Sequence, residues 1–543
     1  MSHNKLNRNN FMVQGSILAF SSILVRLIGI IYRIPMVNTI GEEGSGYYSM
    51  AFNIYNIALI LSSYSLPMAV SKLVAAHNVK KEYRNSLRVL LSAMFFAIIA
   101  GLIFATALYL GADFIAVKIY NMEYVAYPLR VLAPTIFVFA VMGVLRGFFQ
   151  GKSTMLPTAI SQVLEQIVNA IVSVAAAVYF VKMHDASPKV AAYGAAGGTL
   201  GTLSGAIAGF GFLSIVFIMY LPTIKRQLSR DNSGQLNGYR TVYGLLFITV
   251  IPVIFSNFIY QFSGILDDII FSRLLVGKGM AESVRSEIIG VYSTKYKLLT
   301  NLPIAVSSAM AASLIPSIVT SKTLGNLSDV KNKVGVAVKF NMIIAIPAAV
   351  GMSVLGGPIM QMFFPGSSEL AGKLLLYGSI AVVFYALSTI TNAVLQAINR
   401  LTYPAINALV SLVLHIIILV CLLQFTELNA YALMIGNITF PLVICILNWF
   451  QIARSLHYHQ EVIKTFLIPT ISASIMGIVA IVAYKGLYYL LSSNTISVIL
   501  SIGFAAAIYF ILLIAMKGIG VNEIARLPKG NLIVKIFSRL HLL

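Results

Sequence analysis

Apolar runs of 18 or more residues recur from one end of the chain to the other, separated by short polar segments. A run of this length is long enough to cross the hydrocarbon core of a bilayer as a helix. The pattern predicts fourteen membrane-spanning helices. Their approximate ranges are 11–36, 47–70, 89–111, 125–149, 155–181, 192–221, 241–265, 287–316, 334–362, 370–397, 402–424, 428–450, 465–489 and 495–516.

Composition supports an all-α, multi-pass membrane protein. The 543 residues are 59% hydrophobic and only 10% charged, whereas a soluble domain is about 25% charged. The formal charge of +21 would suit a nucleic-acid partner, but most of the 38 Lys and Arg residues lie in short loops. That bias sets topology and predicts a cytoplasmic-membrane protein with both termini in the cytoplasm and no nucleic-acid partner.

A hydrophobic hairpin over 145–166 is repeated about 246 residues later, with one residue inserted. The matching positions are Ala140, Gln150, Pro157, Ala159 and Ile160 with Ala386, Gln396, Pro404, Ala405 and Ile406. The copy is displaced by six spans, an even number, so both copies keep one orientation. We therefore expect two six-helix lobes in a parallel pseudo-twofold repeat, plus two extra helices.

This repeat predicts a domain plan. The first lobe is 1–221, a cytoplasmic linker is 222–240 and the second lobe is 241–450. The last two spans, 465–516, fall outside the six-plus-six scheme. The remainder, 517–543, is typical of a basic amphipathic tail on the inner leaflet.

Glycines recur every four residues in the sixth span and predict a smooth helix face. The positions are Gly197, Gly201, Gly205 and Gly209. Such a face permits close helix approach, either as static packing or as a sliding contact.

Charged residues within spans are candidates for function because the bilayer makes them costly. Arg26 and Arg33 are seven positions apart in the first span, about two turns, so they share a side. In a wet cavity the pair could hold a phosphate group by bidentate hydrogen bonds. The alternatives are that Arg33 reaches the outer interface and that Arg26 pairs with Glu165.

Glu165 lies near the middle of the fifth span. It could pair with an arginine, coordinate a cation or carry a proton. Arg146 ends the fourth span and is either a gate residue or an interface anchor. Asp267 and Asp268 end the seventh span as loop residues or as an outer gate.

Lys295 and Lys297 lie in an apolar run, the eighth span, and suggest a cationic wall from the second lobe. We predict no catalytic residues, because no Walker, zinc-protease or Cys/His pattern is present. We therefore expect that the chain is not an enzyme and that it holds no metal or cofactor. The one exception would be a coupling cation, Na⁺ or H⁺.

Several segments resemble the multidrug/oligosaccharidyl-lipid/polysaccharide (MOP) exporter superfamily, and within it the MurJ/YtgP/SpoVB-like branch of lipid II flippases. The resemblance covers nearly all fourteen spans and rests on Val25–Pro35, Gly46–Tyr48, Leu66–Lys72, Arg146–Gly151, Ser161–Glu165, Asn301–Pro303 and Leu314–Pro316.

The resemblance implies a cavity between two lobes that opens alternately to each side, and a groove for a polyprenyl tail formed by the last two spans. It implies that Arg26, Arg33 and Lys297 bind pyrophosphate, with Lys297 standing where the family has arginine. It also implies cation or potential coupling, and cell-wall synthesis proteins as possible partners.

The leading hypothesis is a flippase for an undecaprenyl-pyrophosphate-linked saccharide, with lipid II for peptidoglycan synthesis as the substrate. The alternatives are an exporter of another lipid-linked polysaccharide or teichoic acid unit, a multidrug or cation antiporter, and a membrane scaffold without transport. A cation exporter should present acidic residues in its cavity, whereas the central charges here are mainly basic.

Overall fold

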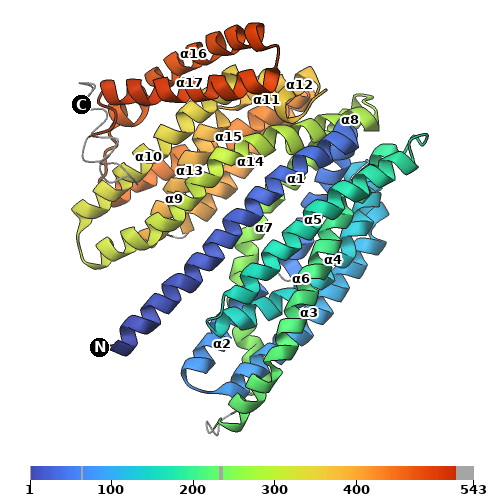
Figure 1. The fold of residues 1–543 in the computed structure, drawn as a ribbon, viewed down its shortest axis with the longest axis vertical. Coiled ribbons are helices and arrows are strands. Elements are labelled where there is room, and N and C mark those ends of the chain that lie inside the picture. The colour runs from blue at the N-terminus through green and yellow to red at the C-terminus, as the bar shows by residue number, and fades with distance from the viewer. Residues whose placement is uncertain (1, 63–64, 232–235, 401, 521–543) are drawn as a thin grey trace. The chain divides into compact units, whose positions relative to one another are not determined.

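The computed structural model describes residues 2–62, 65–231, 236–400 and 402–520. Every regular element within these ranges is helical, and no strand occurs in them, which confirms the all-α prediction. The chain divides into two compact units, residues 1–290 and 291–543 (Figure 1).

The first unit is built from long helices with two short helical segments between α3 and α4. Its core forms where α2, α3, α4 and α6 meet, around buried side chains such as Val70, Phe148 and Leu213. The elements are α1 Ser2–Ser62, α2 Leu66–Val79, α3 Tyr83–Leu110, η1 Phe114–Tyr120, η2 Glu123–Val125, α4 Ala126–Gly151, α5 Leu156–Met183, α6 Val190–Ser229, α7 Tyr239–Gly277 and α8 Glu282–Gly290.

The second unit begins with a π-helix and ends with two antiparallel apolar helices. Helix α16 packs against both α17 and α10, so the two extra helices of the prediction form a paired layer on this unit (Figure 1). The elements are η3 Val291–Tyr296, α9 Lys297–Thr323, α10 Leu327–Val354, α11 Gly356–Phe363, α12 Glu369–Gly378, α13 Ala381–Ala397, α14 Thr402–Phe425, α15 Ala430–Leu456, η4 Ile463–Leu467, α16 Ile468–Leu491 and α17 Asn494–Ala515.

Eleven helical runs in the described ranges are long and apolar enough to cross a membrane, and α12 with α13, bent by 48°, makes a twelfth if counted as one span. The multi-pass membrane fold is confirmed, but the number fourteen is not. One cause is α1, which carries the first predicted span and most of the second in a single run that breaks at Gly41, where φ is 72°. Gly41 lies in the segment between the first two predicted spans, and glycine adopts this conformation without steric cost, so the two helices join across a kink there.

The boundary between the units lies within the eighth predicted span and not in the predicted linker. Helices α7 and α8 both pack against α1, so they belong to the first unit. The linker 222–240 is also shorter than predicted, because α6 continues to Ser229. Buried Ile224 holds this helical extension against the unit. Of the predicted tail, residues 521–543 lie outside the described part of the chain.

The sequence repeat has a structural counterpart at the ends of α4 and α13. Ser153 follows α4 with φ 59°, and Asn399 follows α13, about 246 residues later, with φ 62°. The backbone bonds match as well: Ser153 N donates to Gln150 O at 2.9 Å, and Asn399 N donates to Gln396 O at 3.0 Å. Two helices of similar sequence therefore end in the same left-handed turn, which supports an internal repeat.

A side chain also satisfies the helix-end carbonyl at this turn in both units. Asn78, at the end of α2, donates from Nδ2 to the carbonyl oxygen of Gly151 at 3.3 Å. Lys322, near the end of α9, donates from Nζ to the carbonyl oxygen of Ile398. Helix ends leave such carbonyls without a partner inside the helix. The repeat thus extends to the second and eighth spans, which share the pattern Leu-Pro-x-Ala-Val-Ser at 66–71 and 302–307.

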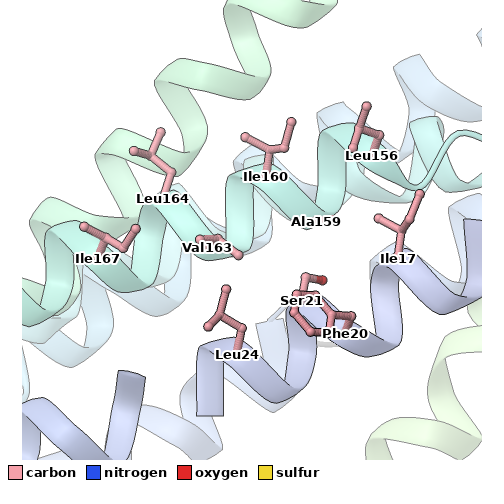
Figure 2. A pocket seen from close by; sticks show the side chains of 10 residues that line it. All are labelled: Ile17, Phe20, Ser21, Leu24, Leu156, Ala159, Ile160, Val163, Leu164 and Ile167. Atoms are coloured by element: carbon pink, nitrogen blue, oxygen red, sulfur yellow. The ribbon is translucent and has the colours of Figure 1, made fainter. Parts of the chain in front are cut away.

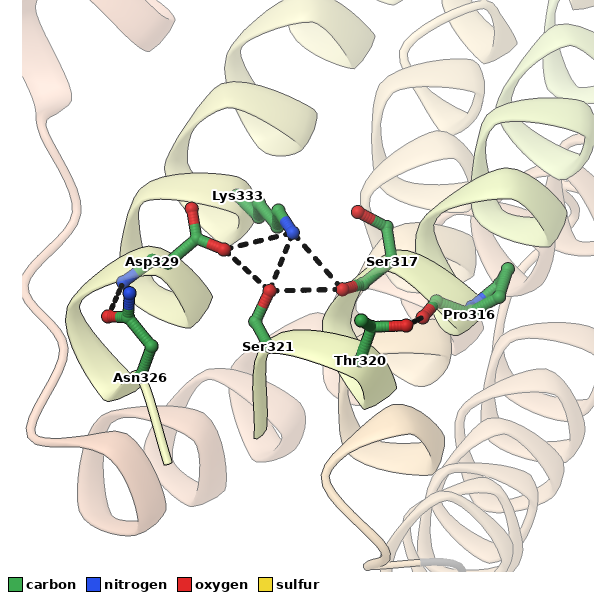
Figure 3. A network of polar contacts seen from close by, with 7 residues as sticks. All are labelled: Pro316, Ser317, Thr320, Ser321, Asn326, Asp329 and Lys333. Carbon is green, nitrogen blue, oxygen red and sulfur yellow. Dashed lines mark hydrogen bonds and ion pairs between the residues drawn. The ribbon is translucent and has the colours of Figure 1, made fainter. Parts of the chain in front are cut away.

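A half-buried lysine, Lys333, makes several bonds that hold the turn between α9 and α10 (Figure 3). Lys333 Nζ lies 2.9 Å from Asp329 Oδ2 and donates to Ser321 Oγ at 2.6 Å and to Ser317 O at 3.2 Å. Asn326 caps α10 by accepting from the backbone N–H of Asp329 at 3.0 Å. The cap and the ion pair together hold the end of α9 against the start of α10.

The predicted glycine face of α6 packs tightly against α5. A methyl group at Gly201 would lie 2.1 Å from Ser173 Oγ and 2.5 Å from the carbonyl oxygen of Asn169. A methyl group at Gly205 would lie 2.5 Å from the carbonyl oxygen of Glu165. Only glycine permits this approach of two backbones, so the face serves as a packing surface in this structure.

Gly201→Ala should destabilise the protein by about 1–3 kcal/mol, because the new methyl group overpacks a backbone contact. The matched control is Gly211→Ala in the same helix, where nothing lies within 4 Å of the added methyl group. Thermal unfolding of both purified variants in one detergent measures the difference. Equal melting temperatures for the two would contradict the packing role.

Burial lowers the pKa of Lys152, which follows α4 outside the membrane spans, to about 8. Its ammonium donates to Asn78 Oδ1 at 2.8 Å and to Gln227 Oε1 at 2.9 Å. Because the unfolded chain holds this proton up to about pH 10.5, it binds more protons than the folded chain above about pH 8. We expect the wild type to gain thermal stability relative to Lys152→Met as pH rises through that window. A constant difference would contradict the buried, proton-losing lysine.

Candidate functional site

Arg26 and Arg33 lie on one uninterrupted stretch of α1, before the break at Gly41. Arg26 is exposed, and it makes no hydrogen bond or ion pair with the described residues. Arg33 is half-buried, and its guanidinium lies beside the phenol groups of Tyr32 and Tyr48. A cation in an apolar run is stable only if it reaches water or an anion, so Arg26 requires one of the two.

A polar network fixes the helix that carries Arg33. The Tyr32 hydroxyl accepts a hydrogen bond from Asn169 Nδ2 of α5 at 3.3 Å. Ser173 Oγ lies 2.9 Å from Asn169 Oδ1 and 2.8 Å from the carbonyl oxygen of Gly198 in α6. These groups are buried, where unpaired polar atoms are costly. The network therefore sets how α1 sits against α5 and α6, and with it the direction of Arg33.

Glu165 forms an ion pair with Arg146. Arg146 Nη2 donates to Glu165 Oε2 at 2.7 Å, and its Nε donates to Ser161 Oγ at 3.1 Å. The two side chains are only 11% and 18% exposed. The pair links α4 to α5 with little water around it, so removal of either charge would leave the other poorly solvated and without a partner.

Two of the predicted alternatives are wrong in this structure. The partner of Glu165 is Arg146, so Glu165 does not pair with Arg26. Asp267 and Asp268 are not loop residues, because α7 continues past both and both are buried. Asp268 Oδ2 accepts from Asn53 Nδ2 at 2.7 Å, which ties α7 to α1 within the first unit.

The two lysines of the second unit have different surroundings. Lys295 is buried, and its ammonium donates to Ser367 Oγ at 2.9 Å. Lys297 is half-buried, with its ammonium 4.3 Å from the ring centroid of Tyr292. Lys295 is therefore committed to the turn before α12, whereas Lys297 keeps part of its surface open to a ligand.

An apolar cavity of about 770 Å³ lies between α1 and α5 (Figure 2). Leu24 projects from α1 towards Val163 of α5 across the gap (Figure 2). The one polar side chain of its lining is Ser21, whose hydroxyl donates to Leu18 O at 2.9 Å. This cavity presents no charge to a headgroup and suits hydrocarbon.

A second apolar cavity, of about 560 Å³, lies within the second unit where α9, α10 and α11 meet α16 and α17. Pro303, Pro347 and Tyr509 contribute to its wall, and the Tyr509 hydroxyl is bonded to Ile343 O at 2.9 Å. A volume of this size is within the range of ligand pockets. The two last helices thus complete a hydrocarbon-lined space.

Tyrosines surround the cationic candidates, and no role was predicted for them. Tyr32 is adjacent to Arg33 and was a visible signal, since tyrosine hydroxyls inside spans need a partner. Tyr48 is separated from Arg33 by the break in α1 and could not be placed from spacing. Tyr292 lies five residues before Lys297, a spacing that puts two residues on different faces of an α-helix.

Comparison with known proteins shows a family match. Residues 12–322 match the family described as "Polysaccharide biosynthesis protein". Lipid II flippase MurJ of Bacillus subtilis (strain 168) is 26% identical over 488 residues, covering 87% of this chain and 87% of the relative. Stage V sporulation protein B of the same organism is 26% identical over 530 residues, covering 97% and 100%.

Solved structures share the fold. A lipid II flippase MurJ in an inward closed conformation has a TM-score of 0.64 at 16% identity, covering 91% of this chain and 97% of that chain. An inward-facing multidrug resistance MATE family transporter of the MOP superfamily also has a TM-score of 0.64 at 16% identity, covering 80% and 95%. The fold is therefore the one found in MurJ and MATE transporters.

Arg146→Met should destabilise the protein by about 1–3 kcal/mol, because it leaves Glu165 poorly solvated without a partner. The double variant Arg146→Met/Glu165→Gln should recover most of that loss. Chemical unfolding of the four proteins of this cycle measures the coupling energy. Additive effects of the two substitutions would show that the pair is not a stabilising unit.

Proposed function

This chain belongs to the polysaccharide biosynthesis protein family of the MOP superfamily, and on that premise we propose that it is a flippase for a polyprenyl-pyrophosphate-linked saccharide. Lipid II is the specific substrate that we propose. Arg26, Arg33 and Lys297 are the cations proposed for the diphosphate. The chain performs no covalent chemistry in this account.

The unpartnered cation Arg26 carries the proposal. It lies in an apolar stretch of α1, exposed and without an ion pair among the described residues. A diphosphate supplies the charge and the acceptor geometry that a guanidinium binds best. The headgroup of such a lipid would exchange hydration for these contacts while its chain stays in hydrocarbon.

The apolar cavity of the second unit supports a site for the polyprenyl tail. It is lined by α16 and α17, the two helices outside the repeat, together with α9 to α11. Burial of isoprene units there would be favoured by about 25 cal/mol for each Å² of apolar surface removed from water. A lipid substrate thus explains both the exposed Arg26 and the apolar cavity of the second unit, and a water-soluble drug requires neither.

The paired Glu165 weakens the case for a cation antiporter. A carboxylate that binds an organic cation or a proton must be available, whereas Glu165 is neutralised by Arg146 at 2.7 Å. The relatives named as flippase and sporulation protein are equally similar to this chain at 26% identity. A second candidate function is therefore export of another lipid-linked glycan unit. In either case we propose cytoplasmic termini, in line with the charge bias.

Expression of this chain should rescue cells depleted of their own lipid II flippase, and Arg26→Ala should abolish the rescue at unchanged protein level. Arg26→Lys should retain part of it, because a point charge replaces the fork. The matched control is Lys80→Ala, which removes an exposed cation from the turn between α2 and α3. Growth and the external appearance of labelled lipid II are the measurements.

Full rescue by Arg26→Ala would overturn the role of Arg26 in transport. Failure of the wild type to rescue, with restored export in cells that lack another lipid-linked glycan transporter, would reject lipid II and select the second candidate. Loss of rescue in the Lys80→Ala control would show that the assay reports general charge effects.

A further inference from the structure

The second unit begins with a π-helix, Val291–Tyr296, directly before Lys297. A π-helix pairs residues i and i+5; it is a rare element and is frequently found at functional sites. Tyr292 and Lys297 have this spacing. In an α-helix, residues five apart point about 140° away from each other, because each residue turns the helix by about 100°. The wide turn therefore brings the Tyr292 ring beneath the Lys297 side chain.

The contact between these side chains is close. The Lys297 ammonium lies 4.3 Å from the centre of the Tyr292 ring. This distance is well inside the range of about 6 Å for an attraction between a cation and an aromatic face. Tyr292 is fully buried, while Lys297 is half-buried. The ring thus supports the cation from the protein side and leaves its other side for a ligand.

The Tyr292 ring is itself held in place. It stacks on Tyr296 with ring centroids 5.7 Å apart and planes inclined by 20°. The Tyr296 hydroxyl donates to Gly378 O at 2.8 Å and accepts from Asn437 Nδ2 at 3.1 Å. A methyl group at Gly378 would lie 2.6 Å from the Tyr296 hydroxyl. The bend between α12 and α13 and helix α15 therefore fix Tyr296, which fixes Tyr292.

Lys295, the other lysine near Tyr292, lies within the π-helix and has different partners. Its ammonium donates to Ser367 Oγ at 2.9 Å and lies 5.5 Å from the ring centre of Phe364. Both partners belong to the connection between α11 and α12. The π-helix thus gives the two lysines different contacts. Lys295 forms a hydrogen bond to Ser367, and Lys297 lies over the Tyr292 ring.

We propose that Tyr292 is a positioning residue, which through the π-helix holds the Lys297 ammonium in the orientation that meets the anionic diphosphate of the substrate. The proposal rests on the proposed function for the identity of the ligand. The cation–ring geometry itself does not depend on it. An aromatic ring, and not its hydroxyl group, is the feature that matters.

The first test measures, without any ligand, whether the Lys297 ammonium lies over the Tyr292 ring. The full chain is reductively methylated with ¹³C, and the dimethyl-lysine resonance that disappears in Lys297→Met is assigned to Lys297. A ring beneath the ammonium should shift this resonance upfield, and Tyr292→Leu should abolish the shift. Tyr292→Phe should preserve it. An unshifted resonance in the wild type, or a shift that survives Tyr292→Leu, would overturn the proposal.

The second test is a double-mutant cycle on binding of undecaprenyl pyrophosphate to the purified chain. Tyr292→Leu should weaken binding about two- to thirtyfold, the range for a cation–aromatic contact. Tyr292→Phe should bind as the wild type does. Tyr292→Leu should add nothing in the Lys297→Met background.

The two tests distinguish failure of the positioning role of Tyr292 from failure of the proposed ligand. Equal weakening by Tyr292→Leu with and without Lys297 would assign Tyr292 to general stability and reject positioning. A wild type that binds no undecaprenyl pyrophosphate, but has a ring-shifted Lys297 resonance, would reject the proposed ligand and leave the held cation standing. Lys295→Met is the matched control, and it should lower thermal stability while leaving the Lys297 resonance shifted.

Discussion

Hydrocarbon offers no partner to a charge or a polar atom, and this constraint governs the arrangement of the whole chain. Several buried polar side chains are paired within each unit. In the first unit Arg146 meets Glu165 at 2.7 Å. In the second, Asn448 accepts from Asn407 at 2.8 Å and donates to Thr391 at 2.9 Å. Arg26, by contrast, has no hydrogen bond or ion pair within the described part of the chain, and it marks a place where a ligand or water can supply one.

The lack of polar partners in hydrocarbon also favours close packing of helices within each unit. Backbone contacts across Gly201 bring α6 against α5 without an intervening side chain. At the ends of α4 and α13, a side chain from a neighbouring helix satisfies a carbonyl group that the helix leaves open. Because these joints occur at corresponding turns, they support an internal repeat between the two units.

Much of the fold was predictable because hydrophobic length alone identifies helices in a membrane. The repeat was visible from Gln150 and Gln396, and the paired last helices followed from the count of spans. The break at Gly41 falls in the predicted gap between the first two spans, but the continuation of the helix on both sides of it was not predictable. The extension of α6 to Ser229 was not predictable either, since both depend on backbone geometry within a mixed run.

For the candidate site, the sequence located the charged residues but not their partners. Glu165 could pair with any arginine at its depth, and only packing selects Arg146. Lys295 and Lys297 look equivalent in the sequence, and a π-helix separates their roles. The central claim is that cations held within the spans bind a lipid diphosphate. Native mass spectrometry of the wild type and Arg26→Ala with undecaprenyl pyrophosphate, undecaprenyl phosphate and undecaprenol tests it most directly. The account predicts tightest binding of the pyrophosphate by the wild type and loss of that preference in the variant; equal binding of all three lipids, or an unchanged preference in Arg26→Ala, would contradict it.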